Sequence, residues 1–328
     1  MSMSESANVS EEPGAPADSE GKSDDVVEDA PDDELGDDDL VDPIVDEEAL
    51  IESKTEMERR FIRRHRDLFS ETLGPDRHLS VEPMRILLQG LKSNDPRLYQ
   101  YKPRQIPLHI RERAKALLDG LESQGIIRKV QPNKGSQFCA QAGFVPKKGG
   151  KLRFVVDFTA LNRYIQRPVH SFPSSDQIAQ SIKSTTTHVG VVDFPSGYFQ
   201  LRLHPESQMY TVFNTEFGRY LFTRSPQGLS SSGDSFNANT DRFFSGLGDW
   251  LLKQVDDLLV QATSVSDLLS KMEIMASEGR QFGCTYSISK FTLGRDVNVV
   301  SGFQLTLDPT GKESPKLGPN PSLSLIHI

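Results

Sequence analysis

Apolar residues recur at helical spacing in three long stretches of the chain after residue 107. The first stretch predicts a helix that ends near Gly125, a C-cap candidate, and the last predicts a helix capped by Ser264 or Ser266. A shorter capped helix is predicted over residues 175–184. The apolar and half-polar positions that define the three long helices are Ile110, Ala114, Leu117, Leu118 and Leu121; Phe236, Thr240, Phe243, Phe244 and Leu247; and Leu268, Leu269, Met272, Met275 and Phe282.

Short strand-like runs separate these predicted helices. Residues 144–146 and 152–158 predict a hairpin around a Lys-Lys-Gly-Gly-Lys turn, and residues 251–262 predict a second strand-turn-strand unit. A strand over residues 187–194 stops at Pro195, which lacks the N–H that a ladder needs, and residues 211–213 and 220–223 flank a turn at Gly218. Helices that alternate with antiparallel hairpins favour an α+β domain with helices packed on one face of a sheet.

The first hundred residues differ in composition from the rest of the chain. Residues 1–50 hold nineteen acids against Lys22 alone, with almost no aromatic side chains, so we expect a disordered acidic segment. Residues 51–100 are interpreted as a linker with short helices, one of them over LFSETLGPD and ending near Gly74-Pro75. The run RRFIRRHR at residues 59–66 is either a nuclear address or nucleic-acid patch, or a solvated helix face that neutralises the acidic segment.

The net charge of -9 divides into -18 for residues 1–50 and +9 for the remainder, and a basic folded part favours a polyanionic partner such as nucleic acid. Two cysteines, Cys139 and Cys284, cannot build a disulfide framework, which points to a reducing compartment. The sequence shows no run of about eighteen apolar residues and no secretory signal. We therefore expect an intracellular protein, cytoplasmic or nuclear, without a membrane partner.

Three carboxylates stand in apolar, strand-like surroundings: Asp193 in VGVVDF, and Asp256 and Asp257 in KQVDDLLV. A buried carboxylate costs several kcal/mol unless it is paired or binds a cation. An isolated Asp-Asp pair is more often a turn or a helix cap, but three such acids predict a site for divalent ions. Because neighbouring strand residues face opposite ways, we expect Asp256 to meet Asp193 across the ladder and Asp257 to support it from the turn.

Four ordered blocks give the chain a family resemblance: LRFVVDFTALNRY, VVDFPSGYFQL, SPQGLSSSGDSF and QVDDLLV. The chain resembles the reverse transcriptase of a Gypsy-like LTR retrotransposon, a retroviral-type polymerase, over residues 101–308. The resemblance implies the fingers and palm of a right-handed polymerase, with an antiparallel palm sheet backed by helices. It also implies RNA-directed DNA synthesis from a dNTP on an RNA or DNA template-primer, with two Mg²⁺ or Mn²⁺ ions held by Asp193, Asp256 and Asp257. The oligomeric state is left open.

Further residue roles are implied by the same resemblance. Lys148 and Arg153 correspond to cations of the fingers that contact the triphosphate, Tyr198 to the aromatic that packs under the deoxyribose, and Lys290 to a lysine near the nucleotide. The remaining implied positions are Gln227 and Gly228 at the sugar, the backbone N–H of Phe194 at the phosphates, and Ser301 and Gly302 at the primer grip. Taken alone, Tyr198 would be a core aromatic, and Lys148 and Lys290 would be surface lysines.

The chain departs from the family pattern at Gln254, where a tyrosine usually precedes the paired aspartates. We expect the polymerase part to cover residues 101–318, without thumb or ribonuclease H, and residues 319–328 to be a tail that fits nothing in the family. Two other functions remain open at this stage. One is a truncated relic without activity, and the other is a nucleic-acid-binding or interaction protein that works through its acidic segment.

Overall fold

The computed structural model describes residues 45–92, 95–99, 102–131, 136–146, 152–171, 173–300 and 302–319, all of which belong to the unit Asp37–Ile328. Most of the expected disordered segment lies outside the described residues, as do Lys148, Ser301 and all but the first residue of the expected tail. That first residue, Pro319, is the last residue of strand β12 (Lys316–Pro319).

A four-stranded antiparallel sheet corresponds to the predicted palm. Its order is β7-β8-β4-β9, formed by Leu251–Gln254, Asp257–Ala262, His188–Asp193 and Thr292–Leu293. The strand that we predicted over residues 187–194 therefore runs from His188 to Asp193, and the predicted strand-turn-strand unit is the β7–β8 hairpin. Asp193 pairs with Asp257 at the end of the β4–β8 ladder.

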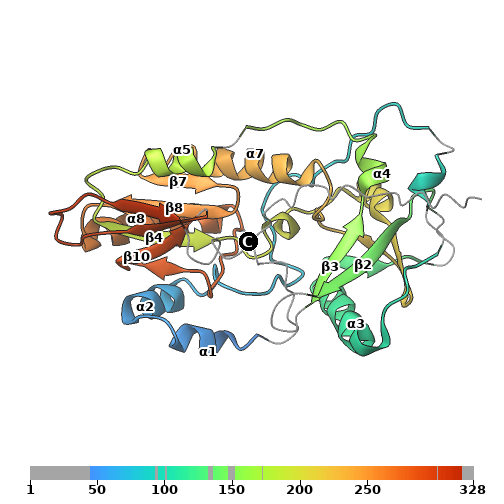
Figure 1. The fold of residues 1–328 in the computed structure, drawn as a ribbon, viewed down its shortest axis with the longest axis horizontal. Coiled ribbons are helices and arrows are strands. Elements are labelled where there is room, and N and C mark those ends of the chain that lie inside the picture. The colour runs from blue at the N-terminus through green and yellow to red at the C-terminus, as the bar shows by residue number, and fades with distance from the viewer. Residues whose placement is uncertain are drawn as a thin grey trace, which may run out of the picture. The chain divides into compact units, whose positions relative to one another are not determined.

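Each face of this sheet is covered by a different layer, because side chains alternate between the two faces along a strand. Helices α7 (Ser232–Phe244) and α8 (Val265–Gln281) pack on one face, where Val192 and Leu258 join a core with Met272 (Figure 1). The hairpin of β10 (Val297–Val300) and β11 (Phe303–Thr306) covers the other face, against Val191 and Leu259. The antiparallel sheet backed by helices is thus confirmed.

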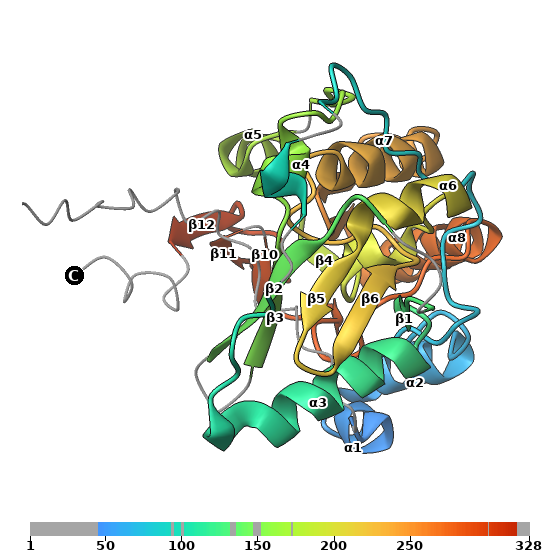
Figure 2. The ribbon, with the colours of Figure 1, turned by 90° about the vertical axis from the view of Figure 1, so that its right-hand side faces the viewer.

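A second sheet of five strands has the order β1-β6-β5-β2-β3, formed by Ile127–Lys129, Gly218–Phe222, Phe213–Thr215, Ala140–Pro146 and Leu152–Asp157. Helix α3 (Leu108–Ser123) lies beside it (Figure 2). Its C-cap is Gln124, and Gly125, the predicted C-cap candidate, is the next residue, with the left-handed φ of 64° that favours glycine after a helix. The predicted β2–β3 hairpin is confirmed. The parallel pairing of β2 with β5 was not predicted.

Several short elements differ from the prediction in their bounds. The helix predicted over residues 175–184 is α5, Ser175–Gln180, because Ser181 already closes it as the C-cap. The strand predicted over residues 211–213 begins only at Phe213, and Thr211 belongs to the 3-10 turn η4 (Met209–Thr211). The remaining short elements are η1 (Pro96–Leu98), α4 (Thr159–Asn162), η3 (Gly197–Gln200) and α6 (Pro205–Gln208).

The amino-terminal segment, defined as residues 45–92, is part of the folded core and not a linker as predicted. Helices α1 (Glu47–Glu52) and α2 (Glu56–Arg64) bury Ile51, Phe61 and Ile62 in the core of the palm. The expected disordered segment is therefore helical at its last residues. LFSETLGPD is not helical, because its backbone instead forms a parallel bridge between Phe69 and Tyr286.

Arginines of the run at residues 59–66 pair with carboxylates of the protein itself. Arg63 pairs with Glu52, Arg64 with Glu273, and Arg66 with Glu47. Glu47 belongs to the acidic stretch that precedes the run. These pairs favour the interpretation of the run as a solvated helix face that neutralises nearby acids. Among the described residues, no helix is both long and apolar enough to cross a membrane.

Candidate active site

Three carboxylates converge at one end of the four-stranded sheet. Asp193 is the last residue of β4, and Asp257, the first residue of β8, lies opposite it in the ladder. Asp256 belongs to the two-residue turn between β7 and β8. One carboxylate oxygen from each residue lies within 4.8 Å of the other two. The predicted convergence of the three acids is confirmed, and it joins two stretches of chain that are more than sixty residues apart.

The two neighbouring aspartates exchange the places that we predicted for them. Asp257 faces Asp193 across the ladder, and Asp256 approaches from the turn. The reason is that the turn between β7 and β8 has only two residues, Val255 and Asp256. Gln254 and Asp257 form the last pair of the ladder, so Asp257 belongs to the strand and Asp256 to the turn. Val255 has a φ of 52°, a conformation that β-branched residues rarely adopt. The strained turn lets both neighbouring carboxylates approach Asp193, which a regular strand would not allow.

Asp193 is the most buried member of the triad, with 1% of its surface exposed. Burial raises the pKa of its carboxyl group well above the usual range, and the nearby charges of Asp256 and Asp257 raise it further. The Nζ atom of Lys290 lies 3.3 Å from Asp193 Oδ1 and supplies part of the missing positive charge. Within the described part of the chain, the buried Oδ2 atom has no hydrogen-bond partner.

These features fit a hard divalent cation. Mg²⁺ and Mn²⁺ prefer carboxylate oxygens, and a buried oxygen without a donor is available to coordinate one. Lys290 at Asp193 and Lys253 near Asp256 face three carboxylates, so room for further positive charge is left. Asp193, Asp256 and Asp257 are therefore the residues that could hold the ions, with Asp193 and Asp257 on one face of the sheet.

The backbone N–H of Phe194 has a partner within the protein itself. It donates to the carbonyl oxygen of Asp256 at 3.2 Å, so in this structure it is engaged in holding the β7–β8 turn against β4. The aromatic ring of Phe194 is fully buried between Phe236 and Tyr286. Phe194 therefore supports the site from the core, and the contact of its N–H with the phosphates remains a prediction.

Tyr198 follows the end of β4 within η3 and is half-buried. Its ring meets that of Phe236 on α7 edge to face, with the centroids 5.7 Å apart. Gly233 on α7 lies close to this ring, since a Cβ there would be in ordinary van der Waals contact with the Tyr198 hydroxyl oxygen, at 3.4 Å. The contact with the deoxyribose remains a prediction.

Two of the expected nucleotide contacts lie in the turn before α7. Gly228 has a φ of 80°, and a Cβ at this position would lie 3.4 Å from the carbonyl oxygen of Val156, so glycine suits the turn. Its own carbonyl oxygen accepts a hydrogen bond from the Asn162 side chain at 2.9 Å. Gln227, which precedes it, is half-buried. The structure thus gives these two residues a place beside β3.

Arg153 and Gly302 lie on other elements than the triad. Arg153 is on β3 of the five-stranded sheet, opposite Val145, and is half-buried. Gly302 has a φ of 83° and occupies the turn between β10 and β11, on the hairpin that covers the triad's face of the sheet. Lys148 and Ser301, their expected neighbours, lie outside the described residues.

Two polar residues near the triad were missed from the sequence. Glu71 adds to the negative charge around Asp193 and accepts hydrogen bonds from the segment that carries Lys290. Lys54 donates to two carbonyl oxygens of the same segment. Both belong to the amino-terminal segment, more than two hundred positions from their partners, and no local pattern marks them.

Comparisons with known proteins agree with this geometry. Residues 145–305 match the family model described as reverse transcriptase (RNA-dependent DNA polymerase). The enzymatic polyprotein of Cestrum yellow leaf curling virus is 30% identical over 175 residues, which are 53% of this chain and 26% of that polyprotein. The Pro-Pol polyprotein of feline foamy virus is 22% identical over 238 residues, 71% of this chain and 19% of that polyprotein. The chain therefore spans a minor part of the length of these relatives.

Solved structures show the same fold. The foamy viral protease-reverse transcriptase in complex with RNA/DNA hybrid has a TM-score of 0.71 at 20% identity, and the match covers 85% of this chain and 36% of that chain. The complex of the same enzyme with dsDNA has a TM-score of 0.70 at 22% identity, over 86% of this chain and 57% of that chain. The expected α+β polymerase fold is confirmed. Residues 145–305 thus match the reverse transcriptase family model, and parts of the chain are similar in sequence to these viral polyproteins.

Proposed function

We propose that this chain is an RNA-directed DNA polymerase that transfers a nucleotide from a dNTP to a primer 3′-OH. The observation that carries the proposal is the convergence of Asp193, Asp256 and Asp257 within 4.8 Å, at a strand end of the reverse transcriptase domain. An RNA or DNA template annealed to a primer is the proposed partner. The complexes of the foamy viral enzyme with RNA/DNA hybrid and with dsDNA support this choice.

The chemistry assigned to the triad is two-metal nucleotidyl transfer. A pair of divalent ions, Mg²⁺ or Mn²⁺, would lower the pKa of the primer 3′-OH and neutralise the triphosphate. The protein would position the ions through carboxylate oxygens. Asp193 and Asp257 offer theirs from two paired strands, and Asp256 offers its own from the turn. Lys290 keeps Asp193 Oδ1 in place through its ammonium group.

The remaining nucleotide contacts are proposed from the resemblance to the family. Lys148 and Arg153 would bind the triphosphate through charge-assisted hydrogen bonds. Tyr198 would pack under the deoxyribose and exclude a 2′-hydroxyl group, while Gln227 and Gly228 would contact the sugar. Ser301 and Gly302 would hold the primer, with Gly302 in the turn between β10 and β11.

Origin and location are part of the same proposal. The blocks LRFVVDFTALNRY and VVDFPSGYFQL support an origin in a Gypsy-like LTR retrotransposon. An intracellular location, cytoplasmic or nuclear, is supported by the two cysteines, Cys139 and Cys284, which are buried free thiols.

Primer extension on an RNA template tests the proposed function. The purified chain, a labelled primer, dNTPs and Mg²⁺ or Mn²⁺ should give extended product, and Asp193→Asn and Asp257→Asn should reduce it by at least about a thousandfold. Arg63→Gln, which breaks an exposed ion pair with Glu52, is the matched control and should extend normally. Folded protein that extends no primer under any of these conditions would instead be an inactive relic.

A further inference from the structure

The Lys290 loop, defined as residues 287–291, carries the lysine that contacts Asp193. Its residues form turns and no regular strand or helix. One backbone hydrogen bond ties its start to the palm, since the Ser287 N–H donates to the carbonyl oxygen of Asp193 at 2.9 Å. The position of the Lys290 ammonium therefore depends on whatever else holds this loop.

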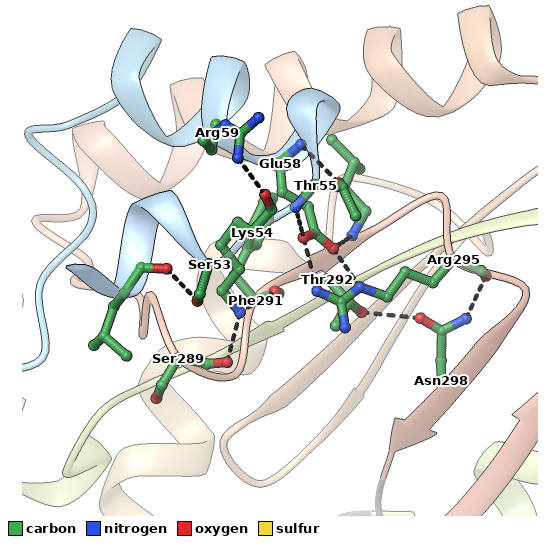
Figure 3. Close-up of polar contacts among 12 residues, drawn as sticks. Ser53, Lys54, Thr55, Glu58, Arg59, Ser289, Phe291, Thr292, Arg295 and Asn298 are labelled. Carbon is green, nitrogen blue, oxygen red and sulfur yellow. Dashed lines mark hydrogen bonds and ion pairs between the residues drawn. The ribbon is translucent and has the colours of Figure 1, made fainter. Parts of the chain in front are cut away.

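Lys54 holds the loop from one side. Its Nζ atom donates to the carbonyl oxygens of Ser289 at 2.6 Å and Phe291 at 2.9 Å, the two residues that flank Lys290 (Figure 3). Only 7% of the surface of Lys54 is exposed, and burial lowers the pKa of its ammonium group. A buried ammonium that donates to two main-chain carbonyls fixes the backbone on both sides of Lys290.

Glu71 holds the same loop through different atoms. Its Oε1 atom accepts the N–H of Ser289 at 2.6 Å and the hydroxyl of Ser287 at 3.0 Å, and its Oε2 atom accepts the hydroxyl of Ser289 at 3.0 Å. Lys54 thus binds carbonyl oxygens of the loop, and Glu71 binds its donors. Together they engage the residues before and after Lys290.

The amino-terminal segment that carries Lys54 is itself firmly docked. Glu58 is fully buried beside Lys54. Its carboxylate accepts two hydrogen bonds from the Arg295 guanidinium (Figure 3). It also accepts hydrogen bonds from the backbone N–H groups of Thr55 and Leu293. Leu293 lies on β9, the edge strand that pairs with β4. Lys54 is therefore placed relative to the strand that ends at Asp193.

We propose that Lys54 and Glu71 are positioning residues of the polymerase reaction, which hold the Lys290 loop so that the Lys290 ammonium faces Asp193. This inference rests on the proposed function. It assigns a role in the active site to a segment that precedes the matched domain at residues 145–305. Lys54 bonds to Ser289 and Phe291, and Glu71 bonds to Ser287 and Ser289, so in this proposal each acts through the loop that carries Lys290.

The charges of the two residues make the proposal testable, because Lys54→Met removes a positive charge and Glu71→Gln removes a negative one. If both act through the loop, each lowers kcat/KM for the dNTP by about ten- to a hundredfold, as expected for a misplaced active-site group. Each should also move the Mn²⁺ affinity of the triad in the direction that Lys290→Met moves it. In a Lys290→Met background, adding either change should have less than about a twofold effect.

Opposite shifts of Mn²⁺ affinity for the two variants would overturn the proposal, because they would show a direct effect of charge. Undiminished effects in the Lys290→Met background would overturn it as well. Arg63→Gln, on the same segment but away from the loop, is the control and should match the unchanged chain.

If Lys54→Met does not fold, Glu71→Gln tests the proposal from the other side of the loop. If the unchanged chain extends no primer, the proposed function fails, while the Mn²⁺ titration still decides the positioning role.

Discussion

Asp193 is deeply buried, and its pKa is raised. In the described part of the chain, no donor forms a hydrogen bond to its Oδ2 atom. Its ionised form is therefore unfavourable in the metal-free protein. An unfolded aspartate ionises near pH 3.9, whereas the folded chain retains the proton to a higher pH. The folded state then binds more protons than the unfolded state. The free energy of unfolding must therefore fall as the pH rises from about 4 through the raised pKa.

Asp193→Asn should remove this penalty. We expect the metal-free variant to be more stable than the unchanged chain at pH 7, by roughly 1–3 kcal/mol, because a buried charge without full compensation has been removed. The difference should vanish below about pH 3, where the aspartate is protonated in both states. Urea unfolding in the presence of a chelator measures both values, and a variant less stable than the unchanged chain at pH 7 contradicts the interpretation.

Tyr198 provides a residue-scale test of sugar selection. Tyr198→Ala removes the ring that packs on Phe236 and opens the space next to the end of β4. The ratio of kcat/KM for a dNTP over the matching ribonucleotide should fall by at least about tenfold, because the steric contact with a 2′-hydroxyl is lost. Tyr198→Phe keeps the ring and should keep the ratio. Equal selectivity in all three proteins would exclude Tyr198 from this role.

At the level of single residues, the sequence identified the triad because acids in apolar runs require compensation. It did not separate the roles of Asp256 and Asp257. Their exchange depends on a two-residue turn that contains Val255 at positive φ, and turns of this kind normally carry glycine or asparagine. Lys54 and Glu71 were not predictable, since only the folded chain brings them to the Lys290 loop.

Among the elements, α2 is tied to β9 by a buried carboxylate, Glu58, which accepts the N–H of Leu293. Burial by itself would raise the pKa of Glu58, but the hydrogen bonds from Arg295, Thr55 and Leu293 outweigh it, and the pKa is lowered. A group with a lowered folded-state pKa stabilises the protein above its unfolded pKa, about 4.3 for glutamate. That contribution disappears as the pH falls through the folded-state pKa.

Glu58→Gln should lower the free energy of unfolding at pH 7 by roughly 1–3 kcal/mol, since Arg295 keeps its charge and loses its partner. The loss is limited because the Arg295 side chain is 39% exposed, so solvent compensates part of it. The difference between the two proteins should shrink below pH 4. Urea unfolding at pH 7 and at pH 3 measures it, and an equal loss at both values contradicts the electrostatic explanation.

The β7–β8 turn offers a second element-scale test. Val255→Gly should raise the free energy of unfolding by about 1 kcal/mol, because relief of the positive-φ strain exceeds the added chain entropy of glycine. Chemical denaturation compares the two proteins directly. A loss of stability would mean that packing of the valine side chain outweighs the strain.

Long periodic elements were predictable, and irregular ones were not. The patterns of α3, α7 and α8 follow helical spacing over several turns, and their positions were confirmed. The prediction of a linker fails for the amino-terminal segment, because much of this segment is attached through isolated bridges, such as Met84 with Leu203, that leave no period in the sequence. The parallel pairing of β2 with the three-residue strand β5 was missed for the same reason.

For the whole molecule, metal binding should be coupled to stability. The triad exists in the folded chain and not in the unfolded chain, so a divalent ion stabilises the fold by about 2.7 kcal/mol at a hundred times its Kd. Added Mn²⁺ should raise the melting temperature of the unchanged chain by several degrees. Asp193→Asn and Asp257→Asn should show little response. A response of equal size in these variants would place the stabilising ion elsewhere.

For the whole molecule, the sequence predicted the fold class, the antiparallel palm sheet and the convergence of the three acids. This was possible because four ordered blocks constrain the order of the strands. The assembly of three sheets did not. The sheet β10-β11-β12 covers the face of the palm that carries Asp193 and Asp257. Its strands are short and contain many polar residues, so the sequence does not show against which layer they pack.

The most direct test of the central claim is the location of bound ions. Crystals of the chain with a template-primer, a non-hydrolysable dNTP and Mn²⁺ should give anomalous scattering peaks within coordination distance of the carboxylate oxygens of Asp193, Asp256 and Asp257. Two peaks, one toward the primer 3′-OH and one toward the triphosphate, are the result that the account predicts. Bound nucleotide with no anomalous peak at these three side chains would contradict it.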